Sequence, residues 1–394
     1  MSRINHKLEI TKPDYDGGSI VNLMRSIGDW CGAAPLPYAP VPDLADRLAA
    51  ARRVVLLVID GLGTEVLQAR GQGSVFERAR IRDLTSVYPP TTASAVTTLL
   101  SGQAPRQHGL TGWFMHFREL GAVAAVLPFM PRYGHTTLTE TGASIASVVD
   151  CASFFATIPR ASQTLLPAEI CDSDISRRLG GPAERVPYQS LEDFANTLGD
   201  ICRGKSEAAF TYAYWSKFDY LCHVHGPSGE KPARHLADLD RALTPVFDAC
   251  AAHGTVLLAV ADHGFIDSGP DERIELARHP ELADMLTLPL CGEPRTAYCY
   301  VRAARARDFE RYVADELGDA AHAVPSEQLI AEGWFGPGRS HPELVARIGD
   351  YTLQMRERYT ISDRLPGERE LHLNGVHGGT SAAEMIVPLM IAGA

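Results

Sequence analysis

Several features that would assign the chain to a specialised class are missing from its sequence. No stretch approaches the roughly 18 consecutive apolar residues of a membrane-spanning helix. The first ten residues, Met1 to Ile10, lack the apolar core of a secretory signal. The sequence contains neither an internal repeat nor a low-complexity tract. At 45% hydrophobic and 22% charged residues, the composition is that of an ordinary globular protein.

Paired cysteines and an excess of positive charge are missing as well. The eight cysteines include no Cys-x-x-Cys pair, and in a chain of 394 residues this indicates free, mostly buried thiols in a reducing compartment. We therefore expect a cytoplasmic protein. The 37 Lys and Arg residues against 48 Asp and Glu residues give a net charge of −11, which argues against binding to a nucleic acid polymer or to an anionic membrane. A small anionic substrate is still compatible with this charge, because bound metal ions reverse the local field.

The hydrophobic pattern predicts an α/β protein. Residues 54–59 and 255–261 are nearly continuous apolar runs, as in parallel strands that are covered on both faces. Residues 230–252 repeat apolar side chains at helical spacing, and residues 92–101 predict a shorter helix that ends before Gly102. The apolar tail at 385–392 is too short to span a membrane and predicts a buried strand. This alternation favours an α/β/α sandwich with a mostly parallel central sheet.

The length allows two domains, or one large domain that carries insertions. Strand–helix alternation is clear in residues 1–109, 206–268 and 365–394, which we interpret as three parts of one core. Residues 110–205 are rich in Gly, Pro, Thr and Ser, and residues 269–364 mix helical patterns with Pro/Gly-rich loops. We expect these two stretches to be insertions that form a cap over the site.

Polar side chains with metal-binding chemistry stand where the apolar strands end. Asp60 closes the first run, and Asp262 with His263 closes the run at 255–261. Because ligands of open α/β sheets bind at the carboxyl ends of strands, distant parts of the chain can meet there. Three further candidates complete a set of three carboxylates and three imidazoles, which suits divalent metal ions; the full set is Asp60, Asp219, His223, Asp262, His263 and His377.

Each of these residues alone has an ordinary explanation. An Asp after a strand can cap a helix, and the spacing of Asp219 and His223, four residues apart, occurs often by chance. His377 could be a simple loop histidine, although its neighbouring glycines let the backbone approach a metal. Thr91 and Thr92 stand at the start of the predicted helix, where threonine is a common N-cap. A threonine hydroxyl becomes a useful nucleophile when a metal lowers its pKa and orients it.

Taken together and in order, these segments resemble the alkaline phosphatase superfamily, most closely its type I phosphodiesterase/nucleotide pyrophosphatase branch. The resemblance rests on six segments, and both predicted insertions match it poorly: Val58-Ile59-Asp60-Gly61, Tyr88-Pro89-Pro90-Thr91-Thr92, His108-Gly109, Asp219-x-x-x-His223, Ala261-Asp262-His263-Gly264 and Gly375-Val376-His377-Gly378. It implies an alkaline-phosphatase-like fold and two divalent metal ions. The donors suit Zn²⁺, while Mn²⁺ and Fe would also fit them.

The resemblance also implies a role for each residue. Asp219, His223 and His377 would hold one ion; the other would be held by Asp60, Asp262 and His263, with Thr92 beside it. Thr92 is chosen over Thr91 because the family nucleophile stands ten residues before the glycine that ends the following helix, here Gly102. Thr92 would attack phosphorus in line and form a covalent phosphothreonine-type intermediate, which water then hydrolyses.

One departure from the family concerns the residues after the nucleophile. Nucleotide pyrophosphatases carry Phe-Pro-Asn there, and the Asn helps to hold a phosphoryl oxygen, whereas this chain has Ala93-Ser94-Ala95. Oxyanion support would come from the Ala93 N–H, Ser94, Lys217 or a cap residue, although Lys217 could equally be a solvated lysine. His108 is interpreted as a structural residue, and Trp215 as a core residue that is a lesser candidate for stacking on a base.

The resulting prediction is a two-metal hydrolase of a phosphodiester or pyrophosphate bond in a small phosphate-ester substrate. A phosphomonoesterase or a phosphonate hydrolase on the same core is the alternative. A sulfatase is disfavoured, because its formylglycine derives from Cys or Ser and not from a threonine such as Thr92. The remaining alternative is a metal-binding module without catalytic activity.

Overall fold

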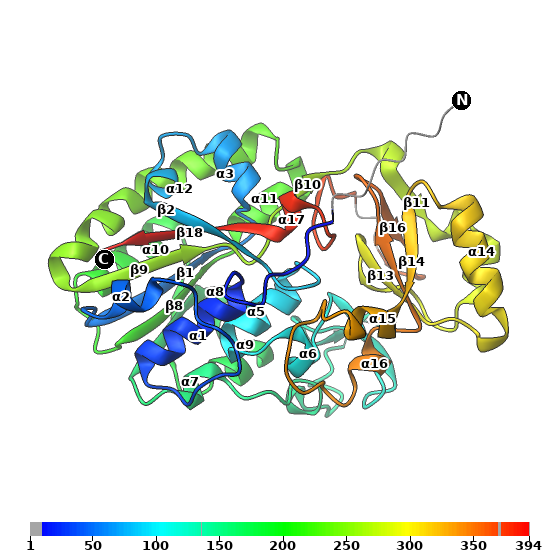
Figure 1. Cartoon of the computed structure of the whole chain (residues 1–394), viewed down its shortest axis with the longest axis horizontal. Helices are drawn as coiled ribbons and strands as arrows, with labels where there is room; N and C mark the ends of the chain where they lie inside the picture. The colour runs from blue at the N-terminus through cyan, green and yellow to red at the C-terminus, as the bar shows by residue number, and fades with distance from the viewer. Residues whose placement is uncertain (1–9, 135, 369–371, 394) are drawn as a thin grey trace.

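The computed structural model describes residues 10–134, 136–368 and 372–393 (Figure 1). Residues 1–9, which make up most of the segment considered for a secretory signal, lie outside the described residues. Within the described ranges, none of the helices combines the length and the apolar character that a bilayer crossing needs. The chain forms two lobes side by side, and each is built on its own seven-stranded sheet.

The larger lobe contains the predicted, mostly parallel sheet. At its centre β1 (Arg53–Ile59) pairs in parallel with β8 (Phe210–Trp215) and β9 (Thr255–Val260). Every residue of β8 and β9 is buried, which explains their continuous apolar sequences. The C-terminal tail forms the predicted strand, β18 (Ile386–Ala392), which runs antiparallel to β9 and to β2 (Arg80–Thr85).

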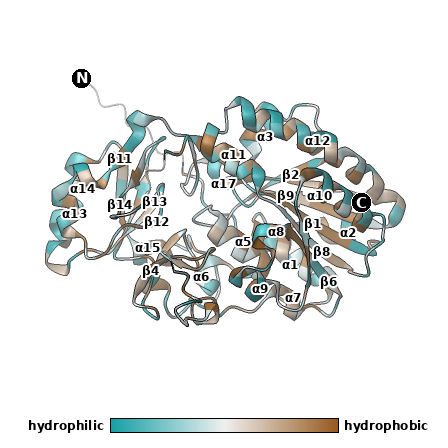
Figure 2. Cartoon of the chain, turned by 180° about the vertical axis from the view of Figure 1, so that it is seen from behind, coloured by the Kyte–Doolittle hydropathy of each residue, from teal (hydrophilic) through white to brown (hydrophobic). Residues whose placement is uncertain are grey.

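Helices cover both faces of this sheet, as expected for an α/β/α sandwich (Figures 1 and 2). On one face, α12 (Glu230–Cys250) packs beside α10 (Leu191–Cys202). α12 confirms the helix predicted at 230–252, since a short 3-10 turn follows it and Gly254 ends it at a φ of 66°. On the other face, α1 (Ile20–Cys31) packs against α5 (Thr92–Ser101), the short helix that was also predicted.

The smaller lobe is an antiparallel sheet with helices on its outer side (Figure 1). Its strands come from both predicted insertions, so segments far apart in the sequence pair with each other. The order across the sheet is β14 (Ala321–Pro325), β15 (Tyr351–Met355), β13 (Thr296–Cys299), β12 (Cys291–Glu293), β3 (Phe114–Phe117), β4 (Ala122–Ala125) and β5 (Met130–Pro131).

The predicted boundary of the first insertion, residues 110–205, was wrong in its second half. β6 (Ser162–Pro167) and β7 (Glu184–Tyr188) are parallel strands at one end of the main sheet, beside β8, and α10 packs on that sheet. These strands are short and lack a continuous apolar run, because β6 contains Ser, Gln and Thr, and β7 contains Glu, Arg and Pro. β6 is nevertheless almost entirely buried, whereas β7, at the edge of the sheet, is largely exposed or half-buried.

All eight cysteines lie in described residues, and all are buried free thiols. This confirms the prediction of free, buried cysteines. Burial raises the pKa of several of them, including that of Cys31 to about 12, so these thiols stay protonated and unreactive at neutral pH.

Candidate active site

Four of the predicted site residues come from the carboxyl ends of three adjacent parallel strands. Asp60 directly follows β1, and Asp262 and His263 follow β9. Asp219 lies in the first turn of α11 (Lys217–His225), the helix that begins two residues after β8 ends. Because β1 lies between β8 and β9, the sheet itself brings these side chains together.

His377 reaches the same place from a small antiparallel ribbon. β17 (Gly375–Val376) pairs with β10 (Ile266–Asp267), and His377 follows β17 directly. His223, on α11, is tied to this ribbon because its Nδ1 lies 2.9 Å from the carbonyl oxygen of Gly375. The ribbon therefore fixes the position of two of the three histidines.

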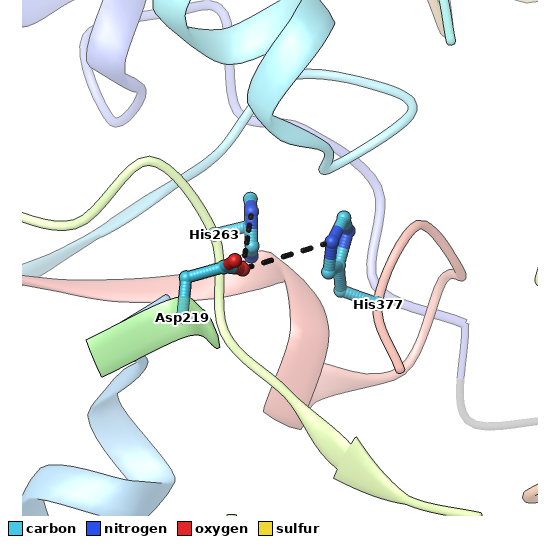
Figure 3. Close-up of side chains that lie close together, drawn as sticks. All are labelled: Asp219, His263 and His377. Atoms are coloured by element: carbon cyan, nitrogen blue, oxygen red, sulfur yellow. Dashed lines mark ion pairs between the residues drawn. The ribbon is translucent and has the colours of Figure 1, made fainter. Parts of the chain in front are cut away.

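The side chains form two overlapping groups. In the first, His263 Nε2 lies 3.4 Å from Asp60 Oδ1 and 3.5 Å from Asp262 Oδ2. In the second, Asp219 Oδ1 lies 4.0 Å from His263 Nε2 and 3.9 Å from His377 Nε2 (Figure 3). The potential ligand atoms of each group all lie within 4.8 Å of one another, so each group could hold a metal ion.

His223 lies at the edge of this cluster. Its Nε2 is 3.5 Å from Asp219 Oδ1, and its ring centroid is 5.0 Å from that of His377. The compact second group contains His263, whereas the resemblance implied His223 at that place. All six predicted side chains therefore meet in one cluster, in which His263 stands between the two groups.

Three buried carboxylate oxygens in the cluster have no hydrogen-bond partner among the described residues. They are Asp60 Oδ1, Asp219 Oδ1 and Asp262 Oδ2. An unpaired buried carboxylate is costly, so such atoms indicate a missing counter-charge. Burial, followed by the neighbouring carboxylates, raises the pKa of Asp60 and of Asp219 well above the usual value. Oxygen and imidazole donors around these atoms fit divalent cations of the zinc type.

The histidines present the nitrogen that a metal would need. Each Nδ1 faces a backbone carbonyl, at Gly375 for His223, Gly264 for His263 and Pro90 for His377. A proton held on Nδ1 by these carbonyls leaves the lone pair on Nε2, which faces the carboxylates. Burial lowers the pKa of His223 to about 4 and lowers that of His377 as well, so both rings are neutral at pH 7.

The hydroxyl of Thr92 lies against this cluster. Thr92 is the first residue of α5, and its Oγ1 is 3.2 Å from His263 Nε2. The hydroxyl of Thr91 is engaged elsewhere, because it donates a 2.6 Å hydrogen bond to Glu293 Oε1. The first turn of a helix leaves backbone N–H groups free, and these favour an anion at this end of α5.

Two residues at the site carried no recognisable signal in the sequence. Tyr214, on β8, donates its hydroxyl to Asp60 Oδ2, and only the alternation of β8 side chains hinted at its direction. Glu293, at the end of β12, accepts hydrogen bonds from Thr91 and from the Trp113 amide. Burial raises the pKa of Glu293 to about 7.

The three residues considered for oxyanion support, Lys217, Ser94 and Ala93, have different surroundings. The Lys217 side chain is exposed, and its ammonium lies 4.4 Å from the centre of the Tyr220 ring. Ser94 is fully buried, and its hydroxyl has no hydrogen-bond partner among the described residues. The Ala93 amide belongs to the open first turn of α5.

Two further interpretations from the sequence can be compared with the structure. His108 is fully buried, with Nε2 3.1 Å from Thr98 Oγ1 on α5 and Nδ1 accepting a hydrogen bond from the Leu110 amide, as expected for a structural residue after the nucleophile helix. Trp215 is 4% exposed and stacks on Tyr188, and its indole N–H donates to His235. Trp215 is therefore a core residue, and its ring face is not available to a substrate base.

Sequence comparison agrees with this geometry. Residues 54–380 match the family model of type I phosphodiesterase / nucleotide pyrophosphatase. The chain belongs to this family. The match includes the six clustered side chains and Thr92, and the family assignment makes the protein a hydrolase of the alkaline phosphatase superfamily. No curated protein sequence gives a significant match.

Solved structures resemble most of the chain. Human ectonucleotide pyrophosphatase / phosphodiesterase 5 superposes with a TM-score of 0.64 at 17% identity, covering 86% of this chain and 87% of that one. The murine protein gives a TM-score of 0.63 with the same identity and coverage. An inactive threonine-to-alanine variant of the murine protein has been solved in complex with AMP. At this identity the likeness establishes the fold.

Proposed function

We propose that this phosphodiesterase family member cleaves a phosphodiester or pyrophosphate bond in a small substrate, with Thr92 as the nucleophile and two divalent metal ions at the cluster. One observation carries the proposal. Three buried carboxylate oxygens without partners among the described residues and three imidazoles whose Nδ1 atoms face backbone carbonyls form one cluster, and the Thr92 hydroxyl lies 3.2 Å from His263 Nε2 in this cluster.

Asp60, Asp262 and His263 would hold one ion, and Asp219, His223 and His377 the other. When bound, such ions stabilise the charge on the attacking and leaving oxygens and lower the pKa of a coordinated hydroxyl. The position of His263, within reach of both groups, supports two adjacent sites rather than two separate ones. Mixed oxygen and nitrogen donors favour Zn²⁺, and Mn²⁺ or Fe would also be accepted.

Residues of the chain itself carry out nucleophilic attack, orient the metal ligands and bind the phosphoryl oxygens. Thr92 Oγ1 attacks phosphorus in line, so that the bond to the leaving oxygen breaks as the threonine ester forms. Tyr214 holds Asp60, and the backbone carbonyls hold the histidine rings, so the groups around the reacting atoms are oriented before the substrate arrives. The free amides at the start of α5 favour the phosphoryl oxygens. Water then hydrolyses the ester and releases Thr92.

The charge at the cluster favours a diester over a monoester. Two divalent ions and the three aspartates leave one positive charge, which matches the single negative charge of a phosphodiester. A monoester dianion would call for an additional cation, and the Lys217 ammonium lies over Tyr220. The murine relative solved with AMP supports a nucleotide or a similar phosphate ester as the substrate class.

The substrate class can be tested with matched esters. We expect the metal-loaded protein to hydrolyse an aryl phosphodiester, such as bis(4-nitrophenyl) phosphate, faster than 4-nitrophenyl phosphate. A nucleoside 5′-phosphate aryl ester extends the comparison to nucleotides. Faster turnover of the monoester, or of a phosphonate, would replace the phosphodiesterase assignment with that alternative.

A further inference from the structure

A short turn of the smaller lobe reaches the site. β12 ends at Glu293 and β13 begins at Thr296, so the hairpin between them has only Pro294 and Arg295 at its tip. This turn, residues 293–296, belongs to the smaller lobe. Its side chains contact the larger lobe at the start of α5, at the loop of His377 and at Glu384, although none of them is among the six clustered side chains.

Glu293 connects the turn to the nucleophile helix. Its Oε1 accepts a 2.6 Å hydrogen bond from the Thr91 hydroxyl and a 2.7 Å hydrogen bond from the Trp113 amide. Thr91 is the N-cap residue of α5 and directly precedes Thr92. The position of Glu293 therefore fixes the backbone from which the nucleophilic hydroxyl projects.

Thr296 connects the turn to the loop that carries His377. Its hydroxyl donates a 2.6 Å hydrogen bond to the Gly378 carbonyl, one residue after the histidine. Gly378 has a φ of 101° and packs so closely that a Cβ there would lie 2.9 Å from the Cβ of Glu293. Glycine is thus required at this position both for its backbone conformation and for the close approach.

Arg295 extends beyond the loop of His377 and contacts the buried Glu384. It forms a bidentate ion pair with Glu384, at 3.1 Å and 3.0 Å, and both side chains are almost fully buried. Glu384 also accepts a 2.7 Å hydrogen bond from the Gly379 amide, and its backbone carbonyl accepts one of 2.8 Å from the Gly264 amide. Gly379 and Gly264 lie in the loops of His377 and His263, so Glu384 touches both loops, through its carboxylate and through its backbone carbonyl.

We propose that the 293–296 turn is a positioning element, through which the smaller lobe holds the nucleophile helix and the His377 loop at a fixed separation. This inference rests on the proposed function, because the separation matters for catalysis only if Thr92 is the nucleophile and the cluster binds metal. Glu293 and Thr296 are positioning residues: each acts on the site through another residue, Thr91 in one case and Gly378 in the other. The smaller lobe thereby sets the metal affinity and the alignment of the nucleophile, in addition to any contact with substrate.

The first test measures metal binding alone, by competing the full-length protein against a chromogenic chelator with Zn²⁺. We expect Thr296→Val to weaken Zn²⁺ binding by roughly 10- to 100-fold, the range seen when residues that orient metal ligands are changed. Thr296→Ser keeps the hydroxyl and should restore most of the affinity. The matched control is Thr352→Val, since Thr352 is equally buried on neighbouring β15 and bonds to Ser326 Oγ, away from the site loops.

The second test measures turnover of the aryl phosphodiester. If Glu293 acts through Thr91, Glu293→Ala and Thr91→Val should each lower kcat by roughly 10- to 100-fold with little change in KM. The double variant should be no slower than the worse single variant. Glu293→Gln should recover much of the loss, because its amide oxygen can still accept both hydrogen bonds.

These readouts separate the inference from the proposed function. Loss of affinity in Thr296→Val that is absent from Thr352→Val supports the positioning element, even if no ester is hydrolysed and the proposed function fails. Equal Zn²⁺ affinity in the wild type, Thr296→Val and Thr352→Val would overturn it. Independent, multiplying effects of Glu293→Ala and Thr91→Val on kcat would overturn the link to the nucleophile.

Discussion

Replacing Asp60 with asparagine should raise the thermal stability of the metal-free protein and reduce the further stabilisation that metal provides. Asp60 lies beside Asp262 and His263, and all three potential ligand atoms are within 4.8 Å of one another. Without metal the carboxylates of Asp60 and Asp262 repel each other. Asparagine has the same shape and can still accept the hydrogen bond from the Tyr214 hydroxyl. The substitution therefore removes the charge of Asp60 and changes little else.

The gain in thermal stability of the metal-free protein follows from the distance between the carboxylates of Asp60 and Asp262. Two negative charges about 5 Å apart repel by up to ~3 kcal/mol at an effective dielectric constant of about 20. The 394 residues of the chain imply an unfolding entropy of about 0.8 kcal/mol/K, at roughly 2.1 cal/mol/K per residue. Asp60→Asn should therefore raise the Tm of the metal-free protein by up to ~4 °C.

Metal should reduce this difference in Tm. An ion at a hundredfold excess over its Kd stabilises the folded state by about 2.7 kcal/mol, which raises the Tm by about 3 °C for each site filled. The wild type should gain this stabilisation at both groups of metal ligands. Asp60→Asn lacks one anionic donor of the first group, so it should gain less than the wild type.

Differential scanning fluorimetry in a chelator, and then with Zn²⁺ or Mn²⁺, provides the assay. The expected result is a higher Tm for Asp60→Asn in chelator and a smaller rise on adding metal. A lower Tm for the metal-free variant would refute the claim that the carboxylates repel each other. Equal rises in both proteins would show that the metal binds elsewhere.

Two further changes test the surroundings of the site. Tyr214→Phe removes the hydroxyl that orients Asp60 and should weaken Zn²⁺ binding by roughly 10- to 100-fold, measurable by chelator competition; unchanged affinity would show that this hydrogen bond does not orient the ligand. Burial raises the pKa of Glu293 from 4.5 to about 7, so the folded state holds this proton more tightly than the unfolded state does. Stability contributed by Glu293 is then complete below pH 4.5 and falls by about 3 kcal/mol as the pH rises to about 7. In chelator, the stability of Glu293→Gln relative to the wild type should rise over this interval in urea unfolding curves, and a constant difference would contradict the assignment.

The parts of the fold that follow from local pattern were predictable. Continuous apolar runs marked β1 and β9, and helical spacing with a terminal glycine marked α5 and α12. Because parallel strands of one sheet end at a common edge, Asp60 and Asp262 could be expected to meet before their distance was known. These inferences needed only neighbouring residues and one rule of sheet geometry.

Contacts between distant segments were not predictable from the same pattern. β12 has only three residues and pairs with β3, which lies far earlier in the chain, so neither strand signals its partner. Glu293 and Thr91 are 202 residues apart, and an isolated Glu before a Pro carries no motif. β6 and β7 were missed because polar residues interrupt their apolar pattern; tertiary packing still buries β6, and β7 is an edge strand that stays largely exposed or half-buried.

The central position of His263 in the cluster could not be predicted from the sequence either. The family resemblance implied two triads of ligands, with His263 in the triad of Asp60 and Asp262. In the structure His263 Nε2 lies within 4.0 Å of the nearest carboxylate oxygens of Asp60, Asp262 and Asp219. Only the packing of β1, β8 and β9 side by side determines this central position.

Trapping the covalent intermediate tests the central claim most directly. Metal-loaded protein mixed with an aryl phosphodiester and quenched in acid should carry the substrate phosphoryl group on Thr92, detected by peptide mass spectrometry. Thr92→Ala should bind Zn²⁺ yet show neither the adduct nor turnover above about one-hundredth of the wild-type rate, since the nucleophile supplies the reaction path. Wild-type turnover by Thr92→Ala, or an adduct on another residue, would contradict the account.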